Sequence, residues 1–310
     1  MCALDVRVLD ADRELDAYLA VSNQARMGVL SRDQWLDAEA RARGHGLRRC
    51  LVGESDGRIV VIASVADEDM TEDGVSAWVV TDGGHRRRGH GRTMMEAVEQ
   101  VLAKRRPVEV RTAVRDDDPE SRAWAERRGF TLFDHTFRSR LDLDAFDPAP
   151  HRDTIERAKA AGLRFTRFGA DDDPDLLFEL FVRLLLDVPD QIEAPDRAFF
   201  QREVIERAGA MSVIAYDGDA PAGLALLLPL GDDEYLNALT GVVPEYRGRG
   251  LARALKVVSG EAAREAGRRY LVTNNNARNA PMLAVNDALG FERESGTLHL
   301  RRMTATSDRH

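Results

Sequence analysis

Hydrophobic and polar residues alternate along the chain in two successive runs, which predict strands and helices in the same order. Expected strands show hydrophobic residues at every second position, and expected helices show them three or four positions apart. The strands of the first run cover residues 6–9, 47–53, 58–66, 74–81 and 107–114, with closing strands within 130–143. The helices of the first run cover residues 12–22, 31–43, 90–105 and 118–129.

The second run repeats this order after an interruption. Because 144–150 contains two prolines and 151–161 has the pattern of a connecting helix, we interpret 144–162 as a linker. The strands that follow cover 163–168, 211–216, 220–228, 235–243, 270–273 and 297–303, and the helices cover 174–187, 197–208, 251–266 and 279–289. We therefore expect two domains, 1–143 and 163–310, each with a mixed α/β (α+β) fold.

An internal repeat connects the two runs. Between a strand and a helix, the first run has the motif HRRRGHG at 85–91, and the second has YRGRGLA at 246–252. In each run a Gly-Phe pair follows, and the spacing from the motif is the same, since 129 − 89 and 290 − 250 both equal 40. Equal order, motif and spacing indicate two copies of one domain.

The turn in each motif has the chemistry of a phosphate site. Glycine lets the backbone approach a ligand closely because it has no Cβ. The helix that begins after the turn offers N–H groups without intrahelical partners and a partial positive charge. A strand, a glycine-bearing turn and a helix N-terminus together predict a ligand that carries a pyrophosphate.

Composition limits the classes of protein that remain. A hydrophobic content of 44% and a charged content of 31% are those of a globular domain, and we find neither a membrane-spanning run nor a signal peptide. Cys2 and Cys50 suggest neither a disulfide framework nor a metal site. We expect a cytoplasmic monomer or homodimer without a metal. The net charge of −9 argues against nucleic-acid binding through the basic residues 85–92.

Both motifs resemble the signature of the GNAT N-acetyltransferase superfamily, which is Arg or Gln, two residues, Gly, one residue, then Gly or Ala. The resemblance covers nearly the whole chain and is similar to the tandem-GNAT arrangement of mycothiol synthase-like proteins. It implies acetyl-CoA or a related acyl-CoA as donor and the primary amine of a small molecule as acceptor, attacking directly. Protein acetylation at a lysine or N-terminus, and a catalytically silent acyl-CoA-binding protein, remain alternatives.

The resemblance also implies which residues contact the cofactor. We expect the second half to be the active one because it keeps more of the family's pattern, including Pro244 and an Asn that contacts the pantetheine arm. Its expected contacts are Leu239, Thr240, Gly241, Val242, Arg247, Gly248, Arg249, Gly250, Leu251, Ala252, Asn279 and Met282. Weaker or absent binding is expected in the first half, at Arg86, Arg87, Arg88, Gly89 and Gly91.

The catalytic residues are less well matched to the family. Glu234 stands thirteen residues before Arg247 (247 − 234), where relatives often place a general base, although it also fits a plain acidic loop. The usual Tyr acid is replaced by Asn286, which cannot donate a proton as a general acid and would instead hydrogen-bond the sulfur. His299 and the acidic loop 187–195 are further candidates for the acceptor cleft, and both also fit a purely structural role.

Overall fold

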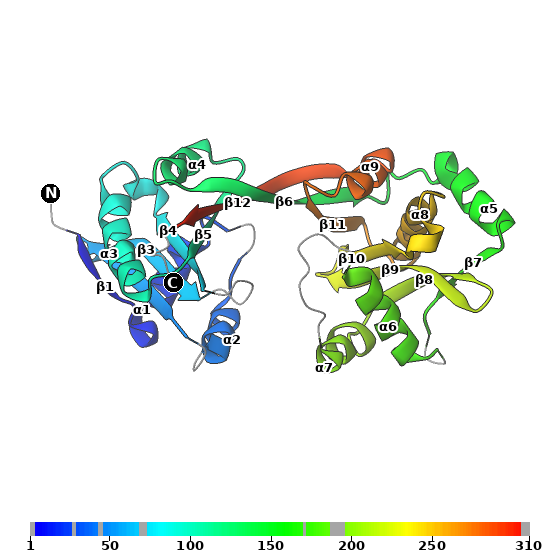
Figure 1. The fold of residues 1–310 in the computed structure, drawn as a ribbon, viewed down its shortest axis with the longest axis horizontal. Coiled ribbons are helices and arrows are strands. Elements are labelled where there is room, and N and C mark those ends of the chain that lie inside the picture. The colour runs from blue at the N-terminus through cyan, green and yellow to red at the C-terminus, as the bar shows by residue number, and fades with distance from the viewer. Residues whose placement is uncertain are drawn as a thin grey trace, which may run out of the picture. The chain divides into compact units, whose positions relative to one another are not determined.

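The computed structural model describes residues 4–26, 29–42, 46–67, 73–169, 172–186 and 196–304. These residues form two compact units. Unit 1 contains the described residues up to His135 together with those from Ser295 onward, and unit 2 contains Thr136–Glu294. Both units combine a sheet with helices, so the expected mixed α/β fold is confirmed (Figure 1).

Unit 1 is built on six strands. Their order across the sheet is β1 (Asp5–Val8), β2 (Arg48–Ser55), β3 (Arg58–Asp67), β4 (Gly74–Thr81), β5 (Glu109–Arg115) and β12 (Glu292–Met303). Only the neighbours β4 and β5 run parallel within this sheet; the other pairs are antiparallel. The helices of the unit are α1 (Ala11–Ser22), α2 (Arg32–Ala42), α3 (His90–Arg105) and α4 (Pro119–Glu126).

Two hydrophobic clusters hold unit 1 together, one on each face of its sheet. Helix α3 packs Met94 and Val98 against Val75 of β4 and Leu300 of β12. On the other face, α1 and α2 bury a second cluster, which includes Leu15, Tyr18, Trp35, Cys50 and Val52. Alternation along β4 explains this, because successive side chains of a strand point to opposite faces.

Unit 2 repeats this plan. The strand order is β6 (Thr131–Asp142), β11 (Tyr270–Asn276), β10 (Glu234–Val242), β9 (Ala220–Leu230), β8 (Met211–Asp217) and β7 (Leu163–Arg167), with β10 and β11 parallel. The helices are α5 (Arg152–Ala160), α6 (Pro174–Leu185), α7 (Arg197–Phe200), α8 (Leu251–Glu265) and α9 (Ala280–Ala288). Helix α7 continues as a π-helical turn over Gln201–Ile205, where the sequence predicted one regular helix.

The closing strands are exchanged between the two runs. Strand β6 ends the first run in sequence, but its residues Thr136–Asp142 pair with β11 of unit 2. Strand β12 ends the second run and pairs with β5 of unit 1 through Thr297–Met303. The unit boundaries therefore differ from the expected 1–143 and 163–310. The reason is that each of the two long strands that follow a Gly-Phe pair joins the sheet of the other unit.

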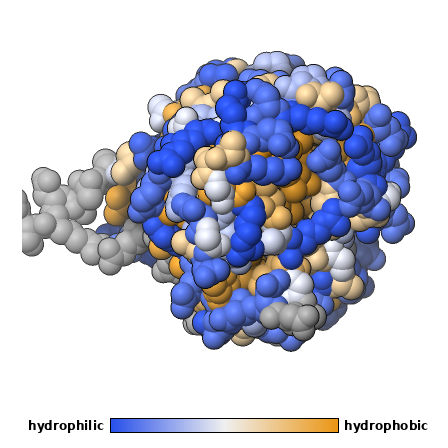
Figure 2. Space-filling model, turned by 90° about the vertical axis from the view of Figure 1, so that its right-hand side faces the viewer, coloured by the Kyte–Doolittle hydropathy of each residue, from blue (hydrophilic) through white to orange (hydrophobic). Residues whose placement is uncertain are grey.

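Helix α5 belongs to the core of unit 2, although its segment reads as a linker in the sequence. Ile155 is buried with Leu143, Phe146 and Val257, and Ala158 packs with Leu255 of α8. The face of unit 2 shown in Figure 2 is mostly hydrophilic, and hydrophobic residues come into view in its recessed middle. Burial of its apolar face accounts for the position of α5 in the core of unit 2, because that face would otherwise be exposed to water.

Close packing between α6 and β10 gives a first testable prediction. A Cβ added to Gly241 would stand 2.8 Å from the Cβ of Leu184, too close for either backbone to remain in place. We expect Gly241→Ala to lower the free energy of unfolding by roughly 1–3 kcal/mol in urea denaturation. Gly84→Ala is the control, since its Cβ meets nothing nearer than Asp82 Oδ2 at 3.5 Å, and an equal loss in both variants would contradict the packing argument.

Candidate functional site

A cavity of about 1290 Å³ opens where β4 and β5 separate in unit 1. The two parallel strands pair only at Gly74–Ser76 with Glu109–Arg111. Beyond that point the segments 77–81 and 112–115 both line the cavity. Backbone N–H and C=O groups on the facing edges of these segments lack strand partners, so they are available to a ligand.

The wall on the α3 and α4 side is apolar. Ala77, Met95, Ala125 and Phe130 line it, and each belongs to the buried core of unit 1. Trp124 of α4 stands beside them, with the guanidinium of Arg128 stacked 3.6 Å from the centre of its ring. A hydrophobic wall opposite unpaired backbone suits an extended chain with amide groups and a small apolar end.

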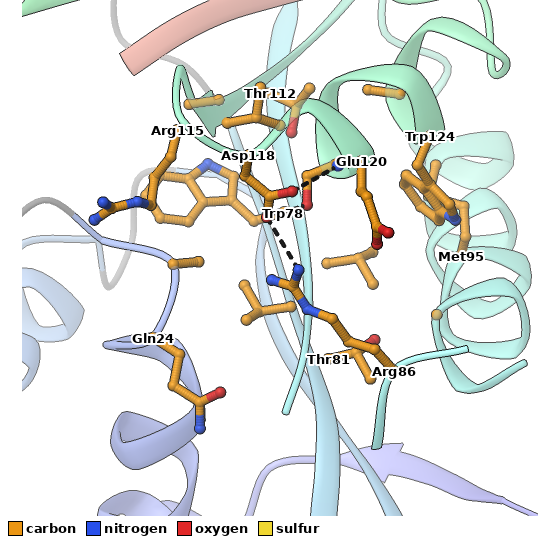
Figure 3. A pocket seen from close by; sticks show the side chains of 18 of the residues that line it. Gln24, Trp78, Thr81, Arg86, Met95, Thr112, Arg115, Asp118, Glu120 and Trp124 are labelled. Carbon is orange, nitrogen blue, oxygen red and sulfur yellow. Dashed lines mark hydrogen bonds and ion pairs between the residues drawn. The ribbon is translucent and has the colours of Figure 1, made fainter. Parts of the chain in front are cut away.

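The glycine-bearing turn closes one end of the cavity. Gly89 adopts a left-handed φ of 90°, and α3 begins at His90 immediately after it. The first N–H groups of α3 therefore have no intrahelical partner and meet the positive end of the helix dipole. Arg86 pairs with Asp118 at 3.1 Å (Figure 3). Arg87 pairs with Glu120. Two guanidiniums, each paired with a carboxylate, therefore stand at the rim beside the turn, where they could contact a bound anion.

Gln24, which follows α1, forms hydrogen bonds at another part of the cavity rim. Gln24 donates to Asp82 Oδ1 at 2.8 Å and accepts from the Gly83 N–H at 2.9 Å. Hydrogen bonds from Gln24 and His85 lower the pKa of Asp82, so this carboxylate stays charged. Trp78 of β4 also lines the cavity (Figure 3). The guanidinium of Arg26 lies 5.1 Å from the Trp78 ring centre.

Unit 2 has the same backbone plan. Strands β10 and β11 pair only at Glu234–Leu236 with Tyr270–Val272. The turn before α8 also matches, because Gly248 and Gly250 have φ values of 75° and 80°, against 64° and 90° for Arg87 and Gly89. The expected turn geometry is thus present in both halves.

Buried polar side chains fill the corresponding opening of unit 2. Lys256 of α8 is 2% exposed and donates to Asn237 Oδ1 at 2.7 Å, and Thr240 Oγ1 donates to the same oxygen at 2.7 Å. Thr273 of β11 donates to the Asn237 carbonyl at 3.2 Å, which ties β11 to β10 directly beyond their last pair. Two strands that could admit a ligand are here joined by side chains.

Asn286, the predicted partner of the leaving sulfur, lies inside this buried region. It is 1% exposed, and its Nδ2 donates to Asn275 Oδ1 at 2.7 Å. Asn275 in turn donates to Ser139 Oγ of β6 at 2.9 Å. Among the described residues, Asn286 Oδ1 has no hydrogen-bond partner. The structure thus gives Asn286 a place in the core network, and its sulfur contact stays a prediction.

Glu234, the predicted general base, is held by two arginines. Its carboxylate forms ion pairs with Arg138 and, at 2.8 Å, with Arg140, both on β6. Glu294 pairs with the same two arginines at 3.2 and 2.9 Å. Both oxygens of the Glu234 carboxylate are therefore engaged by arginines of β6.

A bulge changes the counterpart of Glu234 in the first half. The register of β10 against β9 shifts between Asn237 and Leu239, so β10 contains one extra residue. Spacing to the turn pairs Glu234 with Asp73, whereas strand pairing gives Gly74, the first paired residue of β4. The first half therefore has no carboxylate at the matching strand position.

The remaining predicted residues divide between turn and core. Asn279 caps α9 by accepting from the Met282 N–H at 3.3 Å, Arg247 Nε donates to the Val242 carbonyl at 2.9 Å, and Arg249 lies over the Tyr246 ring. Leu239 and Leu251 are buried, Ala252 is half-buried, and Arg88 is exposed. Burial lowers the pKa of His299, whose ring lies beside Phe133. The loop 187–195 lies outside the described residues.

Sequence reasoning missed the residues that make the first half hollow. The constant spacing of the repeat pairs Met95 and Ala125 with Lys256 and Asn286, whereas the match of Ala77 with Asn237 follows only from the strand pairing, because of the bulge in β10. Ala77, Met95 and Ala125 line the cavity, and the residues at the matching positions of unit 2 are Asn237, Lys256 and Asn286. At these three positions unit 1 has apolar side chains that line the cavity, and unit 2 has buried polar ones.

Two broader classes of site were also searched. Within the described ranges, no three His, Cys, Asp or Glu side chains are grouped so that they could hold a metal ion. None of the described helices has the length and apolar composition needed to cross a membrane.

The family assignment follows from comparison with known proteins. The model of the acetyltransferase (GNAT) family matches residues 15–130 and again residues 175–291. These two matches cover well over half of the chain, and each contains one of the two turns described above. The chain therefore belongs to the GNAT acetyltransferase family, in a tandem arrangement.

Curated relatives are similar over most of their length. A mycothiol acetyltransferase of Clavibacter sepedonicus is 28% identical over 265 residues, which cover 82% of this chain and 84% of the relative. A mycothiol acetyltransferase of Clavibacter michiganensis subsp. michiganensis is 30% identical over 255 residues, covering 81% and 79%.

Solved structures share the fold. A tandem GNAT protein from the clavulanic acid biosynthesis pathway aligns with a TM-score of 0.66 at 22% identity, covering 99% of this chain and 100% of that one. A GCN5-related N-acetyltransferase from Sphaerobacter thermophilus aligns with a TM-score of 0.67 at 18% identity, covering 97% and 95%.

The buried lysine gives a prediction about stability and pH. Burial lowers the pKa of Lys256 from 10.5 to about 7. The unfolded chain keeps the Lys256 proton up to about pH 10.5, so folding releases this proton between pH 7 and 10.5. Below pH 7 the buried amine is charged in the folded protein, and there it destabilises the fold most. The gain in free energy of unfolding of Lys256→Met over the wild type should be largest at pH 6. This gain should shrink by on the order of 4 kcal/mol between pH 6 and pH 10.

Urea denaturation of both proteins across this pH range measures the effect. Asn237 Oδ1 keeps its hydrogen bond from Thr240 in the variant, so the substitution leaves no unpaired acceptor there. Lys159→Met, at an exposed position of α5, is the control and should show no such trend. A difference between Lys256→Met and wild type that does not change with pH would contradict burial of the amine.

Proposed function

We propose that this protein is an acetyl-CoA-dependent N-acetyltransferase that moves an acetyl group to the primary amine of a small molecule, with acetyl-CoA bound in the cavity of unit 1. The cavity between the separated strands β4 and β5 is the observation that carries this proposal. The proposal assigns the donor to the first half, whereas the sequence predicted the second half as the active one.

The cavity offers each part of acetyl-CoA a matching environment. The pyrophosphate would lie at the N–H groups of 87–91, with Arg86 and Arg87 turning to it from Asp118 and Glu120. The pantetheine arm would run between the strands and take hydrogen bonds from the unpaired edge of residues 77–81. The acetyl group would lie against the apolar wall formed by Met95 and Ala125.

The acceptor would enter from the rim near α1 and α2. That rim contains Gln24, Arg26, Gln34 and Trp78, so it combines polar groups with an aromatic surface. A neutral amine would attack the thioester carbonyl carbon, and the C–S bond would break as the amide forms. The amine releases one proton to solvent water, and CoA leaves as a thiolate, which takes up a proton from solvent. A thiol pKa near ~8.5 makes this leaving group tolerable without a protein acid.

The names of the relatives favour a small-molecule acceptor. Both Clavibacter proteins are mycothiol acetyltransferases, and they match this chain over most of its length. A panel of acceptors should therefore contain a mycothiol-type amine beside other small amines and lysine-containing peptides. Free-thiol release with a small amine supports the proposal, whereas release only with peptides favours protein acetylation, and binding without any release favours a silent acyl-CoA-binding protein.

Charge reversal in the two turns tests which half binds the donor. Arg86→Glu should raise the Kd for acetyl-CoA at least about tenfold, because it removes a phosphate partner and places a carboxylate at the anion site; tenfold corresponds to about 1.4 kcal/mol. Arg247→Glu is the matched variant in unit 2 and should leave the Kd within about twofold. Calorimetric titration measures both, and the opposite pattern would assign the donor to unit 2.

A steric pair makes the same test without changing charge. Gly91 lines the cavity, and a Cβ there already meets Thr81 Oγ1 at 3.2 Å and the Trp124 ring at 3.9 Å. Gly91→Val should therefore abolish or strongly weaken acetyl-CoA binding and thiol release. Ala252→Val adds similar bulk at the matching position of unit 2 and should retain both, with thermal unfolding used to show that the two variants are folded.

A further inference from the structure

The two halves share one backbone plan but differ in what occupies the space between their parallel strands. In unit 1 the space is a cavity, and Ala77, Met95 and Ala125 line it. In unit 2 the matching positions are Asn237, Lys256 and Asn286, all at most 2% exposed. This contrast bears on how many donor molecules one chain can bind.

We infer that the closed cluster of Asn237, Lys256 and Asn286 excludes acetyl-CoA from unit 2, so that each chain binds a single acetyl-CoA, in unit 1. The inference rests on the proposed function, and it goes further by assigning these three side chains the role of setting the binding stoichiometry.

The cluster occupies the path that a pantetheine arm would take. Asn237 is the first residue of β10 beyond the paired segment, and its carbonyl accepts from Thr273 across the gap to β11. Its side-chain amide donates to the carbonyls of Leu226 and Leu239, at 3.3 and 3.2 Å. At Asn237 and Leu239 the backbone carbonyls of β10 are thus already bonded within the protein. The matching Thr112 in unit 1 makes no such bond to Ala77 among the described residues.

Lys256 fixes this arrangement from the helix side. Its Nζ lies 2.7 Å from Asn237 Oδ1 and 5.0 Å from the centre of the Phe291 ring, so the amine lies between a β10 side chain and the residue that directly precedes β12. A buried amine needs these partners because its desolvation is costly. A ligand that separated the strands would break the hydrogen bond between Lys256 and Asn237. The amine would then stay buried without this acceptor and without water in its place.

A second observation concerns the phosphate turn of unit 2. Helix α5 lies against it, since a Cβ on Gly250 would stand 3.1 Å from Cγ2 of Thr154, a residue that is 2% exposed. A Cβ on the matching Gly89 would meet nothing within 4 Å. The turn of unit 1 is therefore open on a side where the turn of unit 2 is covered.

Titration of wild-type protein with acetyl-CoA, followed by hydrogen exchange, tests the inference directly. We expect one molecule per chain, with added protection in 77–81 and 112–115 and none in 237–242 or 273–276. Two molecules per chain, or protection in the unit 2 segments, would overturn it. Absence of any binding would overturn the proposed function instead, so the two failures are distinguishable.

Replacing the three side chains tests whether they are what excludes acetyl-CoA from unit 2. Asn237→Ala, Lys256→Met and Asn286→Ala together give unit 2 the residues of unit 1, and we expect the stoichiometry to rise from one to two. A folded triple variant that still binds one molecule would overturn the role of this cluster. Should the triple variant fail to fold, Lys256→Met alone with hydrogen exchange keeps the test decisive: 273–276 should then gain protection from acetyl-CoA, and unchanged exchange there would overturn the role of Lys256.

Discussion

Backbone N–H and C=O groups removed from water must find partners, and the parallel strand pair of each half leaves a set of them without strand partners at the same place. Pairing stops after Ser76 and Arg111 in unit 1, and after Leu236 and Val272 in unit 2. The turn, the helix that follows it and the wall behind the gap are all arranged around this separation. A ligand, or side chains of the protein, must then supply what a neighbouring strand would otherwise provide.

The two halves satisfy this requirement in different ways. Unit 1 keeps an apolar wall and an open turn, which leaves the strand edges to an incoming molecule. Unit 2 uses Asn237 and Thr273 to bridge its strands and buries Lys256 to support them, at a cost in desolvation. A chain with two similar motifs can thus contain one binding site and one closed scaffold, and the motif alone does not distinguish them.

Local sequence signals predicted most of the elements and the family. The bounds of β4 and α3 coincide with the expected 74–81 and 90–105, because strand alternation and helix signals are local properties. The exchange of β6 and β12 was not predictable, since both strands follow a Gly-Phe pair and either could pair with β5. The surroundings of Glu234 and Asn286 were missed for the same reason. Arg138 and Arg140 approach Glu234 from a distant part of the sequence, and so does Ser139, which bonds the Asn275 partner of Asn286.

The exchanged strands also set the order in which the molecule can be completed. A ribosome releases β5 long before β12, although β12 is its partner in the finished sheet. During synthesis the edge of β5 therefore stays open until β12 has been made, and an open edge is a template for pairing with another chain. Unit 2, by contrast, has all its strands once β11 emerges. Unit 1, whose first strands precede those of unit 2, is thus completed after unit 2.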